Sequence, residues 1–152
     1  MTEYIQPKYT CIFDLDGTLA DCSHRLGFVK TKPKNWKAFF AGIPNDPVHE
    51  NVYLELESAL HSNHDIIIVT ARPETEQVRK DTLEWLERNK ITYHKIFFRA
   101  KNDHRDDAIV KSEILDIILE AGHNIHTVYD DKENVLAMYS NRGCNIVKCP
   151  IG

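Results

Sequence analysis

Short apolar runs alternate along this chain with stretches in which apolar residues recur at helical spacing. The clearest run is Ile66-Ile67-Ile68-Val69, whose β-branched residues favour a strand that is buried on both faces. Strands of this kind belong to parallel sheets, because crossover helices cover both faces of such a sheet. The alternation therefore predicts an α/β domain with a mainly parallel central sheet that is flanked by helices.

The other elements follow from the same two periodicities and from cap residues. We expect strands at 9–14, at 66–69 with its end at Thr70, at 96–98, at 125–129 and at 145–148. We expect helices from Asp46 to about His61, from Pro73 through Leu86, from about Asp106 to Ala121, and from Asn134 to Arg142. In the first helix, Asp46 is predicted to be the N-cap and Pro47 the first helical residue. Because no repeat or linker interrupts this order, residues 1–152 are expected to form one domain.

One basic segment, residues 21–43, does not fit the alternation and is expected to be a short, cap-like insertion. Its Trp36, Phe39 and Phe40 have the i, i+3, i+4 spacing of a short helix that packs on the core, which is the interpretation we favour. In the alternative, Trp36 or Phe39 stacks a nucleic acid base while basic side chains follow the backbone. These basic residues are Arg25, Lys30, Lys32, Lys34 and Lys37, and ordinary solvated surface positions also explain them.

Charge and composition exclude several classes of protein. The 152 residues include 19 Lys and Arg against 23 Asp and Glu, and the formal charge of −4 provides no overall basic field for nucleic acid or an anionic membrane. No apolar run approaches the roughly 20 residues that span a bilayer, and residues 1–9 lack the apolar stretch of a signal peptide. The four cysteines form no C-x-x-C pair and are expected to be free thiols. We therefore expect a cytoplasmic protein that binds any polyanion through a local site.

Polar residues gather at the predicted carboxyl ends of the strands, where open α/β sheets bind their ligands. They are Asp14 and Asp16 after the first strand, Thr70 after the second, Asp130 and Asp131 after the fourth, and Lys111 in the first turns of a helix. Crowded carboxylates favour Mg²⁺, which prefers oxygen ligands and keeps room for a phosphate oxygen. Taken alone, each residue has an ordinary explanation as a turn residue, a helix cap or a solvated side chain. Their joint occurrence, in order along the chain, favours one shared pocket.

These residues lie in four segments that together carry a family resemblance. The segments are Phe13-Asp14-Leu15-Asp16-Gly17-Thr18-Leu19-Ala20, Thr70-Ala71-Arg72, the array of Arg99, Asp103, Arg105, Asp107 and Lys111, and Tyr129-Asp130-Asp131. The set resembles the four signature motifs of the haloacid dehalogenase superfamily of phosphotransferases. Within the superfamily it is most similar to the 3′-phosphatase domain of phage polynucleotide kinase/phosphatase enzymes. The resemblance implies a Rossmann-like fold with a small cap, and an enzyme that hydrolyses phosphoric monoesters.

The resemblance also implies a catalytic role for four residues. Asp14 would be the nucleophile that attacks phosphorus and forms an aspartyl phosphate. Asp16 would be the general acid and base, a role worth roughly 10²- to 10⁴-fold in rate. Thr70 and Lys111 would bind the phosphoryl oxygens on which negative charge sits in the transition state.

Mg²⁺ is the cofactor that the resemblance implies, together with a set of phosphate-binding residues. The metal would be held by Asp14, the main-chain carbonyl of Asp16, and Asp130, with Asp131 acting through water. The substrate-binding residues would be Thr18, Arg72, Arg99, Arg105 and, from the insertion, Arg25. Asp103 or Asp107 can hold such arginines by ion pairing, and a surface ion-pair network is the alternative.

Three functions are compatible with these residues. The favoured one is a Mg²⁺-dependent phosphomonoesterase that removes 3′-phosphate from DNA or RNA ends. A 5′- or 3′-nucleotidase of free mononucleotides is the alternative, and a catalytically silent module that binds phosphorylated ends is the third. The expected partners are therefore phosphorylated nucleic acid ends or nucleotides, and nothing indicates a membrane or a protein partner. Because G-x-x-x-x-G-K-[ST] is absent, no 5′-kinase activity is expected of this chain.

Overall fold

Five parallel strands form a single sheet in the computed structural model, which describes residues 8–152. They are β1 (Thr10–Phe13), β2 (Asp65–Pro73), β3 (Lys95–Arg99), β4 (Ile125–Asp130) and β5 (Ile146–Lys148), in the spatial order β3-β2-β1-β4-β5. The predicted α/β fold with a parallel central sheet is confirmed. The sequence predicts no signal peptide in residues 1–9. Residues 1–7 of this segment lie outside the described residues.

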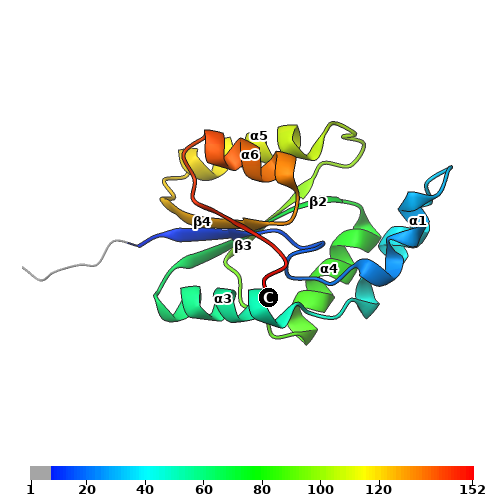
Figure 1. Cartoon of the computed structure of the whole chain (residues 1–152), viewed down its shortest axis with the longest axis horizontal. Helices are drawn as coiled ribbons and strands as arrows, with labels where there is room; N and C mark the ends of the chain where they lie inside the picture. Colours follow the sequence, from blue (N-terminus) through cyan, green and yellow to red (C-terminus); the bar gives the residue numbers. More distant parts are fainter. Residues whose placement is uncertain (1–7) are drawn as a thin grey trace, which may run out of the picture.

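Two pairs of helices cover the two faces of the sheet (Figure 1). The first pair, α3 (Glu50–His61) and α4 (Glu76–Arg88), lies on one face. The second pair, α5 (Asp107–Glu120) and α6 (Glu133–Asn141), lies on the other. Helices on both faces are what parallel strands require, because each strand is joined to the next by a crossover connection. None of the helices in residues 8–152 is long and apolar enough to cross a membrane.

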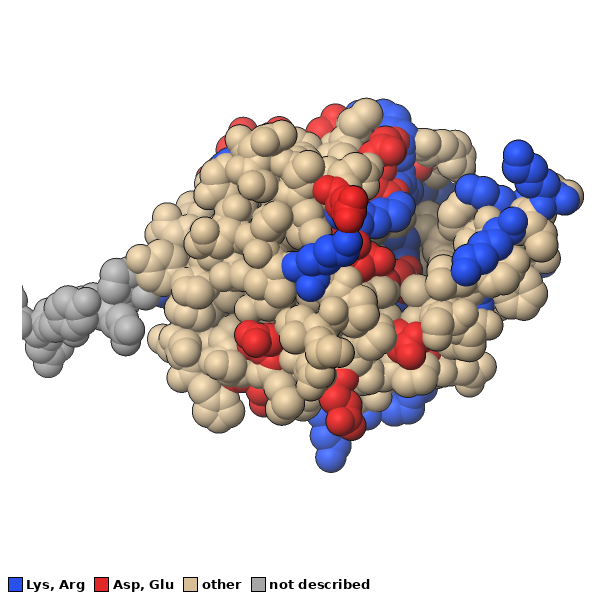
Figure 2. Space-filling model, viewed as in Figure 1, with Lys and Arg blue, Asp and Glu red and all other residues tan. Residues whose placement is uncertain are grey.

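The basic insertion lies between β1 and α3, beside the carboxyl ends of the strands, and we call residues 21–43 the cap (Figure 1). It contains two short helices, α1 (Gly27–Lys30) and α2 (Trp36–Ala41), and a 3-10 turn at Ser23–Arg25. Basic side chains project from this part of the molecule (Figure 2). The predicted short helix at the aromatic residues is confirmed, and Phe39 is buried. The core position favoured for Trp36 is wrong, because α2 packs through Phe39 and leaves Trp36 49% exposed.

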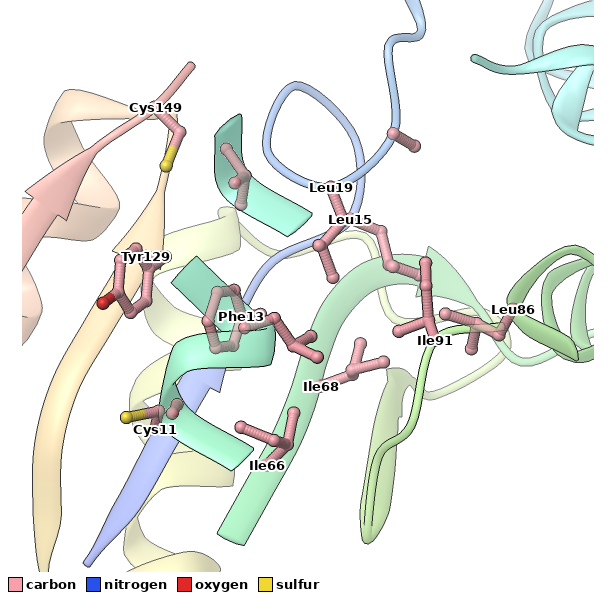
Figure 3. Close-up of a cluster of buried hydrophobic side chains, with 14 of the residues drawn as sticks. Cys11, Phe13, Leu15, Leu19, Ile66, Ile68, Leu86, Ile91, Tyr129 and Cys149 are labelled. Atoms are coloured by element: carbon pink, nitrogen blue, oxygen red, sulfur yellow. The ribbon is translucent and has the colours of Figure 1, made fainter. Parts of the chain in front are cut away.

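The strand residues divide between two apolar layers according to their alternation. Phe13, Ile66 and Ile68 face α3 and α4, and the Phe13 ring stacks on Tyr129 with ring centroids 4.3 Å apart (Figure 3). Their neighbours Ile12, Ile67 and Val69 face α5 and α6. Both layers are almost fully excluded from solvent, which confirms that the run at 66–69 is a strand buried on both faces. The four cysteines are free thiols, as predicted.

Two predicted helix starts are wrong. Helix α3 begins at Glu50, with His49 as its N-cap, because the side chain of Asp46 is taken up by other contacts. Strand β2 continues past Thr70 to Pro73, where it pairs with β3. Pro73 therefore ends a strand and does not open a helix; the hydroxyl of Thr75 caps α4 by accepting from the Val78 amide.

Two leucines of α3 test the packing of this helix. Leu56 is fully buried, whereas Leu54 is 62% exposed. We expect Leu56→Ala to lower the free energy of unfolding by about 2–5 kcal/mol, because it removes buried methyl groups and leaves a cavity. The control Leu54→Ala should change it by about 0.5 kcal/mol or less. Urea denaturation followed by circular dichroism measures both, and similar losses in the two variants would contradict the packing.

Candidate active site

The connections of the sheet change direction beside β1, which lies between β2 and β4. The chain leaves β1 toward β2 and β3 over one face, and it returns to β4 over the other. In open α/β sheets such a switch point leaves a crevice at the carboxyl ends of the strands, and ligands bind there. Asp14 directly follows β1, and Asp130 ends β4. The two residues lie side by side because the Asp14 amide donates to the Tyr129 carbonyl at 2.9 Å.

A buried lysine joins these two aspartates. Lys111 Nζ lies 2.9 Å from Asp14 Oδ1 and 2.6 Å from Asp130 Oδ2. The other oxygen of Asp14 accepts from the Thr18 hydroxyl at 3.1 Å. Lys111, Asp14 and Asp130 are all buried, although Lys111 comes from α5, far along the chain. The structure therefore brings together three residues that the sequence predicted for the site, with Thr18 next to them.

Asp131 adds a third carboxylate to this cluster. One oxygen from each of Asp14, Asp130 and Asp131 can be chosen so that the three lie within 4.8 Å of one another. Burial and the charge of Asp130 raise the pKa of Asp14 well above its ordinary value. The pKa of Asp131 is also raised, first by burial. Burial by itself lowers the pKa of Lys111, but the two aspartates that it contacts raise it.

These pKa shifts share one physical cause, an excess of negative charge in a poorly solvated place. A single ammonium group faces three carboxylates, so the cluster still lacks positive charge. A divalent cation supplies that charge, and carboxylate oxygens are its preferred ligands. The three aspartates can therefore hold a metal ion.

Gly17 allows the loop after β1 to approach this cluster. Its φ angle of +85° is one that favours glycine. A β-carbon at this position would lie 2.2 Å from Asp131 Oδ2, which is closer than atoms can approach. The glycine in the Asp-Leu-Asp-Gly-Thr segment is thus required by both its backbone conformation and its contact with the third carboxylate.

Asp16 points away from the three-carboxylate cluster and toward two buried arginines. Its Oδ1 accepts from Arg25 Nη2 and from Arg72 Nη2, both at 2.6 Å, and its Oδ2 accepts from Arg72 Nε at 3.1 Å. Burial raises the pKa of Asp16, but the charges of Arg72 and Arg25 outweigh it and lower the pKa to about 2. The Asp16 carboxylate is therefore ionised at neutral pH, and its predicted contribution to the metal site is limited to its main-chain carbonyl.

Asp46 is the residue that sequence reasoning missed. Its fully buried carboxylate accepts from Arg25 Nε at 2.8 Å and from Arg25 Nη2 at 2.6 Å. Its main-chain carbonyl accepts from the Trp85 indole at 2.8 Å. The sequence Asp46-Pro47 has the pattern of a helix start, and no local signal connects Asp46 with an arginine 21 residues earlier. Asp46 and Asp16 together hold Arg25, which is itself only 1% exposed.

The remaining predicted residues lie around this centre in different ways. Thr70 is buried in β2, where its hydroxyl accepts from the Arg72 amide at 3.1 Å. Arg99 donates to the carbonyls of Ala71, Asp103 and Arg105 and pairs with Asp107. Its donors thus hold the loop between β3 and α5, and its phosphate-binding role stays a prediction.

Arg105 lies on the surface, about half exposed, and pairs with Asp103 and Glu113. This is the surface ion-pair network that the sequence left open as an alternative. Lys132, also half exposed, contacts Asp107 at 2.6 Å and so connects the loop after β4 with the start of α5. The predicted array therefore divides into two parts. Lys111 is buried at the aspartate cluster, whereas the residues from Arg99 to Asp107 stabilise the loop between β3 and α5.

Comparison with known proteins agrees with this architecture. A chain of a hydrolase from Streptococcus pneumoniae has a TM-score of 0.66 at 14% identity, covering 94% of this chain and 93% of that one. A haloacid dehalogenase-like family protein from the same organism has a TM-score of 0.62 at 15% identity, covering 93% and 84%. A chain of the Pnkp1/Rnl/Hen1 RNA repair complex has a TM-score of 0.76 at 22% identity. That match covers 97% of this chain but 45% of the other, so this chain spans less than half of its length. No curated protein matches the chain.

A family model for a phosphatase domain matches this chain, which places the fold and its aspartate cluster in the haloacid dehalogenase class of phosphatases. The family model described as the polynucleotide kinase PNKP phosphatase domain matches residues 8–152. The chain therefore belongs to the family of PNKP phosphatase domains.

Two aspartates test how much a buried and an exposed ion pair each contribute to the stability of the folded protein. We expect Asp46→Asn to lower the free energy of unfolding by roughly 3–5 kcal/mol, because it leaves the buried Arg25 without its main counter-charge. The control Asp103→Asn breaks the exposed pair with Arg105 and should change the free energy of unfolding far less, because solvent screens an exposed pair. Thermal and urea denaturation measure both, and an Asp46→Asn variant as stable as the control would show that Arg25 is not held by Asp46.

Proposed function

We propose that this domain is a Mg²⁺-dependent phosphomonoesterase that removes the 3′-phosphate from DNA or RNA ends. The observation that carries the proposal is the pairing of Lys111 with both Asp14 and Asp130 at the switch point of the sheet. Membership of the PNKP phosphatase family supports a polynucleotide end as the substrate. The similarity to a chain of an RNA repair complex points the same way.

In this proposal Asp14 is the nucleophile. Lys111 and Thr18 orient its two oxygens, so one of them attacks phosphorus while the bond to the 3′-oxygen breaks. The product of this step is an aspartyl phosphate, which divides one difficult displacement into two easier ones. Asp14, Asp130, Asp131 and the main-chain carbonyl of Asp16 would hold Mg²⁺, and the bound ion would neutralise charge between the carboxylate and the phosphate.

Asp16 transfers the protons. It gives a proton to the departing 3′-oxygen and later accepts one from the water that cleaves the aspartyl phosphate, which releases phosphate and regenerates Asp14. The guanidinium groups of Arg25 and Arg72 hold Asp16 as an anion before substrate binds. A phosphoryl group that draws these donors onto its own oxygens raises the pKa of Asp16 and prepares it to carry the proton. Thr70 and Lys111 complete the set of donors to the phosphate.

Phosphate release from matched substrates tests this function. The substrates are a 3′-phosphorylated oligonucleotide, its 5′-phosphorylated twin, and the 3′- and 5′-mononucleotides, each assayed with Mg²⁺. We expect the highest kcat/KM for the 3′-phosphorylated oligonucleotide, and a loss of at least about 10³-fold in Asp14→Asn, because an amide cannot form the covalent intermediate. A preference for a mononucleotide would make the domain a nucleotidase. Binding of phosphorylated ends without any turnover would make it a silent binding module.

Metal binding can be measured without turnover. We expect Mg²⁺ at 100 times its dissociation constant to stabilise the folded protein by about 2.7 kcal/mol, seen as a rise in Tm that EDTA reverses. Asp130→Asn should lose this rise, because it removes one of the three clustered carboxylates. The control Asp116→Asn changes a carboxylate that pairs with Arg142 on the surface, and it should keep the rise. A Tm that does not respond to Mg²⁺ in the wild type would contradict the metal site.

A further inference from the structure

The cap is a basic surface on an acidic protein. Between Asp21 and Asp46 the chain contains five Lys and Arg residues and neither Asp nor Glu, although its overall formal charge is −4. The rest of the chain is therefore more acidic than this overall value indicates. Four of the five basic residues are exposed, namely Lys30, Lys32, Lys34 and Lys37. None of these four lysines takes part in an ion pair within residues 8–152, so their charges are available to a polyanion.

Two large aromatic side chains lie exposed among these lysines. Phe28 on α1 is 44% exposed and Trp36 on α2 is 49% exposed. The two helices are tied together close to these residues, because the Asn35 amide donates to the Phe28 carbonyl at 2.7 Å. Lys34 Nζ lies 5.6 Å from the centroid of the Trp36 ring. Exposed aromatic rings flanked by unpaired cations are the features that bind single-stranded nucleic acid, whose bases stack while its phosphates meet the cations.

A short chain of contacts connects Trp36 with the active site. The Trp36 ring meets the Phe39 ring edge to face, with centroids 5.7 Å apart. The guanidinium of Arg25 lies 4.4 Å from the centroid of Phe39, and its Nη2 donates to Asp16. Only two side chains therefore separate Trp36 from the carboxylate proposed to transfer the protons. In Figure 1 the cap lies beside the carboxyl ends of the strands, on the same side as the site.

We propose that the cap surface formed by Phe28, Trp36 and the four exposed lysines binds the single strand that leads to the terminal 3′-phosphate. Bases next to the terminal nucleotide stack on the aromatic rings, and the lysines contact the backbone phosphates. This proposal rests on the proposed function and extends it from the terminal phosphate to the preceding nucleotides. The rest of the chain carries net negative charge, which favours the basic cap as the path of the strand.

Trp36 provides a direct readout of binding, because the other tryptophan, Trp85, is fully buried. The probe is a single-stranded oligonucleotide with a 3′-hydroxyl end, which cannot be turned over. We expect it to quench the fluorescence of the wild type but not that of Trp36→Ala. The variant with Lys30, Lys34 and Lys37 all changed to Gln should bind at least about tenfold more weakly by fluorescence anisotropy. Its log Kd should depend on log salt with a slope smaller by about 2, since each phosphate contact on a single strand contributes about 0.7.

Lys95→Gln is the control for the removal of one positive charge away from the cap. Lys95 is exposed at the start of β3, at the end of the sheet opposite the active site. This variant should bind and turn over the oligonucleotide as the wild type does. Far-UV circular dichroism and urea midpoints check that all variants keep the wild-type fold. Equal weakening per removed charge in Lys95→Gln and in the triple variant would show that only general charge attraction acts, and it would overturn the proposal.

A kinetic comparison separates this proposal from the proposed function. We expect Trp36→Ala to lower the ratio of kcat/KM for a 3′-phosphorylated oligonucleotide to kcat/KM for the 3′-mononucleotide by about 5- to 150-fold, which is the range for loss of one stacked base. A wild type that prefers mononucleotides would refute the proposed substrate, and it would still support the cap surface if the hydroxyl-ended strand binds and the triple variant weakens that binding. A wild type that prefers the oligonucleotide, with an unchanged ratio in Trp36→Ala and unchanged binding in the triple variant, would refute the cap surface alone.

Discussion

The candidate active site depends on one interaction, the pairing of the Lys111 ammonium group with Asp14 and Asp130. Asp14 follows β1 and Asp130 ends the neighbouring strand β4, and a buried cation between them offsets the repulsion between like charges. Because Asp131 adds a third carboxylate, one ammonium does not neutralise the cluster, and the pKa of Asp14 is raised. The folded site therefore carries more negative than positive charge. A bound divalent cation would offset this excess and would allow an anionic phosphate group to approach the carboxylates.

A second buried ion-pair network fixes the position of the Asp16 side chain. Arg25 and Arg72 converge on Asp16, while Asp46 holds Arg25 from the other side. Buried ion pairs contribute little net stability but fix geometry, because any member left alone becomes an uncompensated buried charge. Arg25 belongs to the cap and Arg72 to β2, so the network ties the cap to the sheet through the side chain proposed to transfer protons. In this arrangement the cap is a structural part of the active site as well as its neighbour.

Sequence patterns predicted the parts of the structure whose causes are local. Apolar alternation placed all five strands, and the ends of those strands pointed to Asp14, Asp130 and Asp131. The errors occurred where a distant partner decided the outcome. Asp46 has the pattern of an N-cap, but its carboxylate binds Arg25. Strand β2 extends to Pro73 because β3 lies beside it. Trp36 has the spacing of a core residue, but the six-residue helix α2 buries Phe39 and leaves Trp36 exposed.

By itself, the sequence determined the fold class, the positions of the strands and the four segments that carry the family resemblance, because hydrophobic periodicity and short motifs act over a few residues. The tertiary structure decided which charged groups meet. It placed Lys111 between two strand ends, directed Asp16 toward two arginines and away from the aspartate cluster, and left Trp36 on the surface of the cap. These outcomes depend on contacts between residues far apart in the chain. A charged side chain chooses its partner by burial and distance, and neither quantity exists before the chain has folded.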